Sequence, residues 1–277
     1  MPTVGLLHPG AMGVSVGAAL RMRGVRVLWC PNGRSSETRQ RAEAEGLSAV
    51  KTQRELCAAS DIILSVCPPD AALDVARSVA ADGFAGVYVD ANAVSRATVS
   101  EIERAATVAG AAFVDGGILG PPARMGGNTL LCLSGQRAPD VASLFLGTSL
   151  EPRVIGPSVG QASALKMAFA AWSKGSTALL LAVRALAEAE GVSEALLQSW
   201  EHLSPELRER SERAALGAAP KAWRWVGEMH EIAASFEAAG LPSGFHAGAA
   251  ELYERLAPFK TEAATFEAVL QKLLPRR

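Results

Sequence analysis

The chain has 277 residues, of which 49% are hydrophobic and 20% are charged. Its 27 basic and 28 acidic residues leave a formal net charge of -1. These values exclude a disordered chain and argue against a nucleic-acid-binding protein that works through bulk positive charge. The length suits one large domain or two modest ones.

Short apolar segments alternate with helix-compatible segments through the first half of the chain. Strands are expected at 4–7, 25–29, 61–66, 86–90 and 112–114. Helices are expected between them, at 11–23, 35–45, 71–81 and 95–109. Because the strands are apolar throughout, this alternation predicts an α/β domain whose parallel sheet is covered on both faces.

The second half has a different composition. It is rich in Ala, Leu and Glu, with glycines and prolines separating the segments, which predicts helices at 161–190, 193–202, 205–216, 220–239 and 242–256. We therefore place a domain boundary in 156–160. Residues 1–158 are expected to form a Rossmann domain, and residues 159–277 an all-α domain.

A glycine turn follows the first expected strand. The dinucleotide-binding motif G-x-G-x-x-G lets backbone N–H groups face a pyrophosphate at a helix N-terminus. Two of its glycines are present, and a histidine stands at the first position. The alternative is a tight turn without a ligand. The turn predicts dinucleotide contacts from His8, Pro9, Gly10, Ala11, Met12 and Gly13.

The residues after the second strand bear on the choice of cofactor. An acidic residue there binds the ribose 2′-hydroxyl of NAD, whereas an arginine suits the 2′-phosphate of NADP. No acid occupies this position, and Arg34, Ser35 and Ser36 offer a guanidinium and two hydroxyls. With Asn32 nearby, this predicts NADP rather than NAD. The alternative is a solvated turn in which a serine caps the next helix.

Four motifs together resemble the β-hydroxyacid dehydrogenase superfamily, the relatives of 6-phosphogluconate and 3-hydroxyisobutyrate dehydrogenases. The family's G-x-I-G-x-G-x-M-G corresponds to residues 5–13, and its D-x-S-T loop to 90–93. Its D-A-P-V-S-G-G segment corresponds to 115–121, and its helix motif G-x-G-x-x-x-K-x-x-N-N to 160–170. The C-terminal half resembles a divergent class of phosphogluconate-dehydrogenase-like domains without a defined function. The resemblance implies further cofactor contacts from Cys67, Pro68 and Asn92.

The departures from the family pattern lie on the substrate side. The two asparagines of the helix motif are replaced by Phe169 and Ala170, and the serine of D-x-S-T by Asn92. The serine of the S-G-G turn is Leu119. The resemblance therefore implies the fold and the cofactor but does not name the substrate.

The segment 161–183 carries only two charges, Lys166 and Lys174. We expect such an apolar helix to be buried nearly all round. A buried ammonium is costly, so each lysine is expected to be paired, to face a wet cleft or to have a lowered pKa. The alternative is a lysine that extends to the surface. Helical spacing places Ser173 and Thr177 on the face of Lys166, which corresponds to the family's catalytic lysine.

These features predict an oxidoreductase that transfers hydride between NADP and a small hydroxy or carbonyl substrate. Lys166 is the expected general acid/base, assisted by Asn92 and Lys174, and the two lysines favour an anionic substrate. Further contacts to the substrate are expected from Gly117, Ile118, Leu119, Gly120, Ser173 and His230.

Two other functions are compatible with the sequence. An imine reductase has the same fold and cofactor, but such enzymes usually carry Asp or Tyr at the position of Lys166. A non-catalytic NADP-binding protein is the third interpretation, because the asparagine pair is absent. We expect a cytoplasmic protein with no metal site and no nucleic-acid or membrane partner, since the N-terminus has no signal-like segment and the four cysteines have no C-x-x-C spacing. The resemblance implies a homodimer, because members of the family often build the substrate cleft between subunits.

Overall fold

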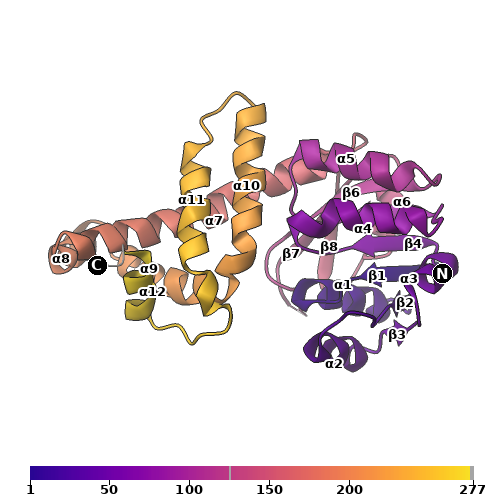
Figure 1. Ribbon diagram of the computed structural model, residues 1–277, viewed down its shortest axis with the longest axis horizontal. Coiled ribbons are helices and arrows are strands. Elements are labelled where there is room, and N and C mark those ends of the chain that lie inside the picture. The colour runs from indigo at the N-terminus through magenta and orange to yellow at the C-terminus, as the bar shows by residue number, and fades with distance from the viewer. Residues whose placement is uncertain (125, 275–277) are drawn as a thin grey trace. The chain divides into compact units, whose positions relative to one another are not determined.

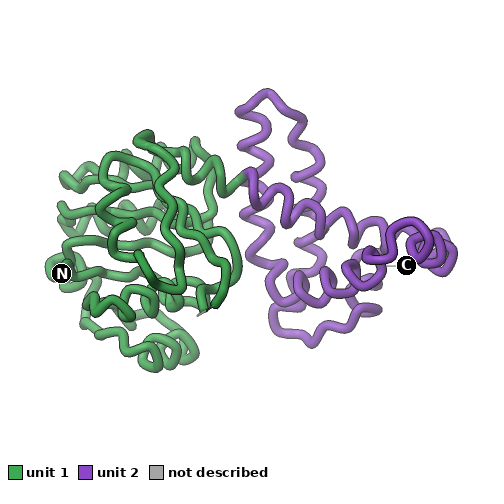
Figure 2. Tube along the Cα trace, turned by 180° about the vertical axis from the view of Figure 1, so that it is seen from behind, with its two compact units in different colours: residues 1–167 green, residues 168–277 purple. Residues whose placement is uncertain are grey.

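The computed structural model describes residues 1–124 and 126–274. The chain divides into two compact units, residues 1–167 and 168–277 (Figure 2). This division falls within helix α7 (Gln161–Ala189). The boundary expected from the sequence, between residues 158 and 159, lies before this helix. The start of α7 belongs to the first unit because its backbone is hydrogen-bonded to a buried aspartate of the sheet, Asp115.

An eight-stranded sheet forms the centre of the first unit, in the order β3-β2-β1-β4-β5-β6-β7-β8 (Figure 1). Adjacent strands are parallel, except that β7 runs antiparallel to β6. The α/β fold class predicted from the sequence is confirmed. The strands are β1 (Thr3–Leu7), β2 (Arg26–Trp29), β3 (Ser48–Ala49), β4 (Ile62–Ser65), β5 (Val87–Asp90), β6 (Ala112–Leu119), β7 (Thr129–Ser134) and β8 (Leu150–Gly156).

Helices cover both faces of this sheet, which explains why its central strands are apolar throughout. On β2, Val27 and Trp29 point into one hydrophobic cluster and Leu28 into another, as strand geometry requires. The first cluster includes residues of α1 (Ala11–Met22), α2 (Ser36–Ala44) and α6 (Ala138–Ser143). The second includes residues of α3 (Gln53–Ala59), α4 (Pro69–Ala81) and α5 (Arg96–Thr107).

Side-chain caps set the start of three of these helices. Ser35 accepts a hydrogen bond from the amide of Thr38, Thr52 from Glu55, and Ser95 from Thr98. Such caps satisfy amides that have no partner within the helix.

Strand β8 was not expected from the sequence, because a proline between two charged residues interrupts its segment. Glu151 and Arg153 form an exposed ion pair on either side of Pro152, at 2.6 Å. Pairing with β7, itself not predicted, makes this segment a strand. It is therefore an edge strand formed by tertiary context and not by intrinsic preference.

The second unit is entirely helical in the part of the chain that the structure describes. Besides the rest of α7, it contains α8 (Ser193–Leu203), α9 (Glu206–Ala218), α10 (Ala222–Ala238), α11 (Gly244–Arg255) and α12 (Phe266–Leu273). Helices α10 and α11 lie side by side (Figure 1). The rings of Trp225 on α10 and Tyr253 on α11 meet edge to face at 5.2 Å. None of its described helices is long and apolar enough to span a membrane.

Helix α7 exposes large apolar side chains. Phe169 is 42% exposed, Trp172 69%, Leu179 50% and Leu186 61%. The expectation that this helix is buried nearly all round is wrong for the single chain. One side of the helix is apolar and exposed. The composition of the segment alone does not distinguish such a side from a buried one.

Candidate functional site

The turn between β1 and α1 has the geometry of an anion-binding loop. His8 lies in the left-handed region at φ 64°, where the motif normally has glycine. A Cβ on Gly13 would lie 2.4 Å from the carbonyl oxygen of His8, so this position requires glycine. Gly10 caps α1 with no side-chain hydrogen bond. The first amides of α1 are thus available for an anion such as a pyrophosphate.

A cavity of about 260 Å³ opens beside this turn. It brings the turn together with the end of β2 and the start of α3. None of its lining residues is acidic, and the only charged side chain among them is that of Arg34, whose pKa is lowered by burial. The lining residues are Leu6, Leu7, His8, Cys30, Asn32, Arg34, Thr52 and Gln53.

Only some of the predicted cofactor-binding residues line this cavity. His8, Asn32 and Arg34 line it, whereas Ser35 does not and instead caps α2. Asn32 donates its amide to the carbonyl of Lys51 at 2.7 Å. Sequence reasoning missed Thr52 and Gln53, because the helix that they begin was not predicted.

Asn92 lies in a buried polar cluster after the carboxyl end of β5. It is 2% exposed. Its Nδ2 donates to Asp90 Oδ2 at 2.6 Å and to Ser65 Oγ at 3.2 Å, and its Oδ1 accepts from the amide of Cys67 at 2.6 Å. Both amide hydrogens are therefore engaged within the protein. The arrangement makes Asn92 a residue that orders the two loops after β4 and β5.

Burial controls the ionisation of this cluster. It raises the pKa of Asp90 to about 7, against the opposing effect of the hydrogen bonds from Asn92. It also raises the pKa of the Cys67 thiol to about 12. Cys67 is therefore a neutral thiol at physiological pH and not an activated nucleophile.

Asp115, at the point where β6 leaves the parallel part of the sheet, fixes the start of α7. Its Oδ2 accepts from the amides of Gly160 at 2.9 Å and Ser163 at 3.1 Å, and from Ser134 Oγ at 2.8 Å. Its Oδ1 accepts from Ser163 Oγ at 2.6 Å. A buried carboxylate with four donors locks the first turn of α7 against the sheet.

Lys166 follows one turn later on α7. Its Nζ donates to the carbonyl of Ile118 at 2.7 Å. The helix approaches β6 so closely that a Cβ on Gly117 would lie 2.9 Å from Lys166 Cβ. The ammonium is therefore positioned beside the segment 117–120. Of that segment, Ile118 and Leu119 are buried, so it presents backbone groups more than side chains.

The predicted residues of the second unit have different surroundings. Lys174 forms an ion pair with Glu228 at 2.8 Å and lies 5.5 Å from the centre of the Trp225 ring. Its charge is thus balanced by a carboxylate that sequence reasoning had not assigned to it. Ser173 is half-buried on α7, and His230 is exposed on α10.

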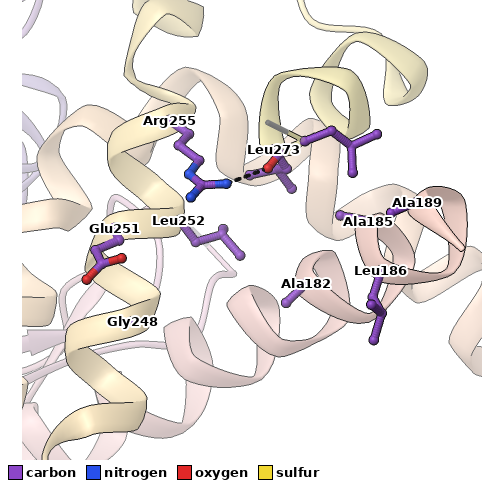
Figure 3. A pocket seen from close by; sticks show the side chains of 10 residues that line it. Ala182, Ala185, Leu186, Ala189, Gly248, Glu251, Leu252, Arg255 and Leu273 are labelled. Atoms are coloured by element: carbon purple, nitrogen blue, oxygen red, sulfur yellow. Dashed lines mark hydrogen bonds between the residues drawn. The ribbon is translucent and has the colours of Figure 1, made fainter. Parts of the chain in front are cut away.

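A second cavity, of about 350 Å³, lies entirely within the helical unit (Figure 3). Its walls are mainly Ala and Leu side chains, and Arg255 at its rim donates to the carbonyl of Leu273 at 2.7 Å. Glu251 is the other charged residue of its lining. The described residues contain no cluster of His, Cys, Asp or Glu that could hold a metal ion.

Two family models and one curated relative match the chain. Residues 3–144 match the NAD-binding domain of 6-phosphogluconate dehydrogenase, and residues 187–256 match a domain of unknown function. An uncharacterized 28.5 kDa protein of Methanothermus fervidus is 35% identical over 178 residues, which are 64% of this chain and 68% of that protein.

Solved structures show the same fold along nearly the whole chain. A conserved protein of unknown function, described as similar to 3-hydroxyacid dehydrogenases, is 27% identical, with a TM-score of 0.66 over 93% of this chain and 98% of its own. The 3-hydroxyisobutyrate dehydrogenase of Mycobacterium tuberculosis, solved with L-serine, is 18% identical, with a TM-score of 0.70 over 99% and 100%.

Proposed function

Since the chain belongs to the β-hydroxyacid dehydrogenase superfamily, we propose that it is an NADP-dependent oxidoreductase that acts on a small, anionic hydroxy or carbonyl compound. The observation that carries the proposal is the placement of Lys166 Nζ at 2.7 Å from the carbonyl of Ile118. The contact fixes an ammonium beside a glycine-containing strand end.

Lys166 is the general acid/base of the proposed reaction. On reduction it gives a proton to the carbonyl oxygen of the substrate, and on oxidation it takes the proton from the alcohol. When bound, the nicotinamide supplies or accepts the hydride. Asp115 and Gly117 act on Lys166 indirectly, because they set the position of the helix that carries it.

The choice of NADP is supported by the cavity beside the glycine turn. The turn of residues 8–13 fits a pyrophosphate, and Arg34 in the adjoining cavity fits a 2′-phosphate. An NAD site needs an acid for the ribose hydroxyl, and none lines this cavity. Asn92 contributes indirectly, by holding the Cys67 amide and the loop of Cys67 and Pro68 next to the turn.

A turnover screen with the purified protein tests the proposal. NADPH and NADH are each offered with 2-oxo and 3-oxo acids, with cyclic imines and with no substrate. Lys166→Met is expected to lower kcat about 10²- to 10⁴-fold and to leave the Kd for NADPH within about twofold, because the loss is in proton transfer. The matched control is Lys221→Met, at an exposed lysine, which should keep full activity.

Other results of the screen distinguish the remaining functions. Reduction of imines that persists in Lys166→Met would identify an imine reductase with another proton donor. NADPH binding with no turnover of any compound would identify a non-catalytic NADP-binding protein. Either result contradicts the role proposed for Lys166.

We further propose that the helical unit pairs with a second copy of the chain through α7. Phe169, Trp172, Leu179 and Leu186 are exposed at spacings of three and seven residues, which is the pattern of a helix that packs against another helix. Trp172→Glu is expected to give a monomer by light scattering after size exclusion. Leu203→Glu, at an equally exposed leucine on α8, should leave the dimer intact.

A further inference from the structure

His8 occupies a position that the backbone reserves for glycine. Its φ of 64° lies in the left-handed region, and within the described part of the chain no other residue except glycine has a positive φ. Strained backbone conformations cluster at ligand-binding sites. The imidazole is therefore the feature of this turn to explain.

The imidazole of His8 has a ring nitrogen without an internal partner. His8 lines the 260 Å³ cavity together with Arg34 and Asn32. Its Nδ1 is buried and has no hydrogen-bond partner among the residues that the structure describes. Burial and the nearby charge of Arg34 lower the pKa of His8 to about 4, so the ring is neutral at physiological pH.

No acidic residue lines the cavity, but Glu37, Glu55 and Asp70 lie in the first turns of the neighbouring helices α2, α3 and α4. Cys30 at the end of β2 and Cys67 after β4 are thiols near Arg34, and burial keeps Cys67 neutral. The first turn of α1 carries no acidic residue. Thr52 and Gln53, at the start of α3, are uncharged, and Gln53 donates to Asp82 and Ser78. The lining itself thus offers a dianion the guanidinium of Arg34, the neutral imidazole of His8 and no carboxylate.

We propose that His8 and Arg34 together bind the 2′-phosphate of NADP, and that His8 takes up a proton from solvent as the phosphate binds. The neutral ring becomes an imidazolium, whose N–H donates to a phosphate oxygen, and no other bond forms or breaks. The phosphate replaces water as the partner of the protonated ring and stabilises its charge. This inference rests on the proposed function and adds a proton-linked residue to its choice of cofactor.

The proton linkage has a measurable consequence. Where the free protein has a neutral His8 and the complex a protonated one, the affinity for NADPH rises up to tenfold for each unit of falling pH. Below about pH 6 the gain ends, because the phosphate itself becomes protonated. NADH has no 2′-phosphate, so its affinity should not follow this dependence.

Isothermal titration calorimetry in buffers of different ionisation enthalpy tests the inference, since it counts the protons taken up on binding. At pH 7.5 the wild type is expected to take up close to one proton with NADPH and none with NADH. His8→Asn tolerates a positive φ and cannot be protonated at this pH. It should abolish the uptake, weaken NADPH about 10- to 100-fold and leave NADH within about twofold.

Two further variants control the experiment. His8→Gly fits the backbone at this position and should behave like His8→Asn, so a loss in both is not a folding defect. His202→Asn removes an exposed histidine of α8 and should keep the proton uptake. NADPH binding without proton uptake, or uptake that persists in both His8 variants, overturns this inference alone. Absence of NADPH binding overturns the choice of NADP as well.

Discussion

Replacing Asp115 by alanine is expected to be the most damaging single change in the sheet unit. The carboxylate is fully buried and accepts four hydrogen bonds, two from backbone amides of residues 160 and 163 and two from serine hydroxyls. The hydroxyls can rotate to other acceptors, but the amides cannot. Each buried donor left without an acceptor costs about 1–3 kcal/mol. We therefore expect a loss of about 3–5 kcal/mol in the free energy of unfolding, and a fall in Tm of about 10 °C.

Urea denaturation followed by circular dichroism measures this loss, with Asp74→Asn as a matched control. The side chain of Asp74 is 82% exposed in an i,i+3 ion pair, so its replacement should change stability by less than about 0.5 kcal/mol. A loss below about 1 kcal/mol in Asp115→Ala would refute the reasoning, because it would mean that the amides find other acceptors. The variant should also lose turnover, since the turn of α7 that precedes Lys166 is no longer held.

Three further predictions concern single contacts. Gly117→Ala places a Cβ 2.9 Å from Lys166 Cβ, so it should cost about 1–3 kcal/mol in urea denaturation and lower kcat with little change in the Kd for cofactor. Asp90 has a folded pKa of about 7 against an ordinary 3.8, so the folded state holds the proton more tightly than the unfolded state. Its contribution to stability is complete below about pH 4 and is lost as pH rises towards 7. Asp90→Asn should flatten that slope in denaturation curves taken between these pH values. Glu228→Ala leaves Lys174 without its partner in a largely buried site and should cost about 2–4 kcal/mol, whereas the double change with Lys174→Met should recover at least half of the loss.

The central part of the fold could be predicted from the sequence because both faces of its sheet are covered. Strands buried on both sides are largely apolar, so β1, β4 and β5 can be recognised as apolar segments with a polar residue only at one end. Strand β8 is visible only in the structure, since Pro152 and its charged neighbours resemble a loop. The apolar side of α7 could not be distinguished from a buried side, because composition does not say whether another surface covers it.

The parts of the candidate site that could be predicted are those formed by a single short segment of the chain. The glycine turn and Arg34 are local features, so their sequence pattern was sufficient to single them out. The four donors to Asp115 and the pairing of Lys174 with Glu228 join distant segments of the chain, and no sequence spacing indicates them. Asn92 was singled out as a catalytic and cofactor-binding residue, which stays a prediction, and the sequence did not indicate that its amide hydrogens are bound to Asp90 and Ser65.

The two ends of the sheet have a consequence for its behaviour in solution. Strand β3 at one end has only two residues, and β8 at the other carries a proline and an ion pair. An edge with exposed N–H and C=O groups is a template on which other chains add strands. A short edge offers few such groups, and Pro152 and the charges of Glu151 and Arg153 oppose an added strand. Both edges of the sheet thus oppose the addition of strands from other chains. At β8, the residues that do so are the same ones that kept this strand from being predicted.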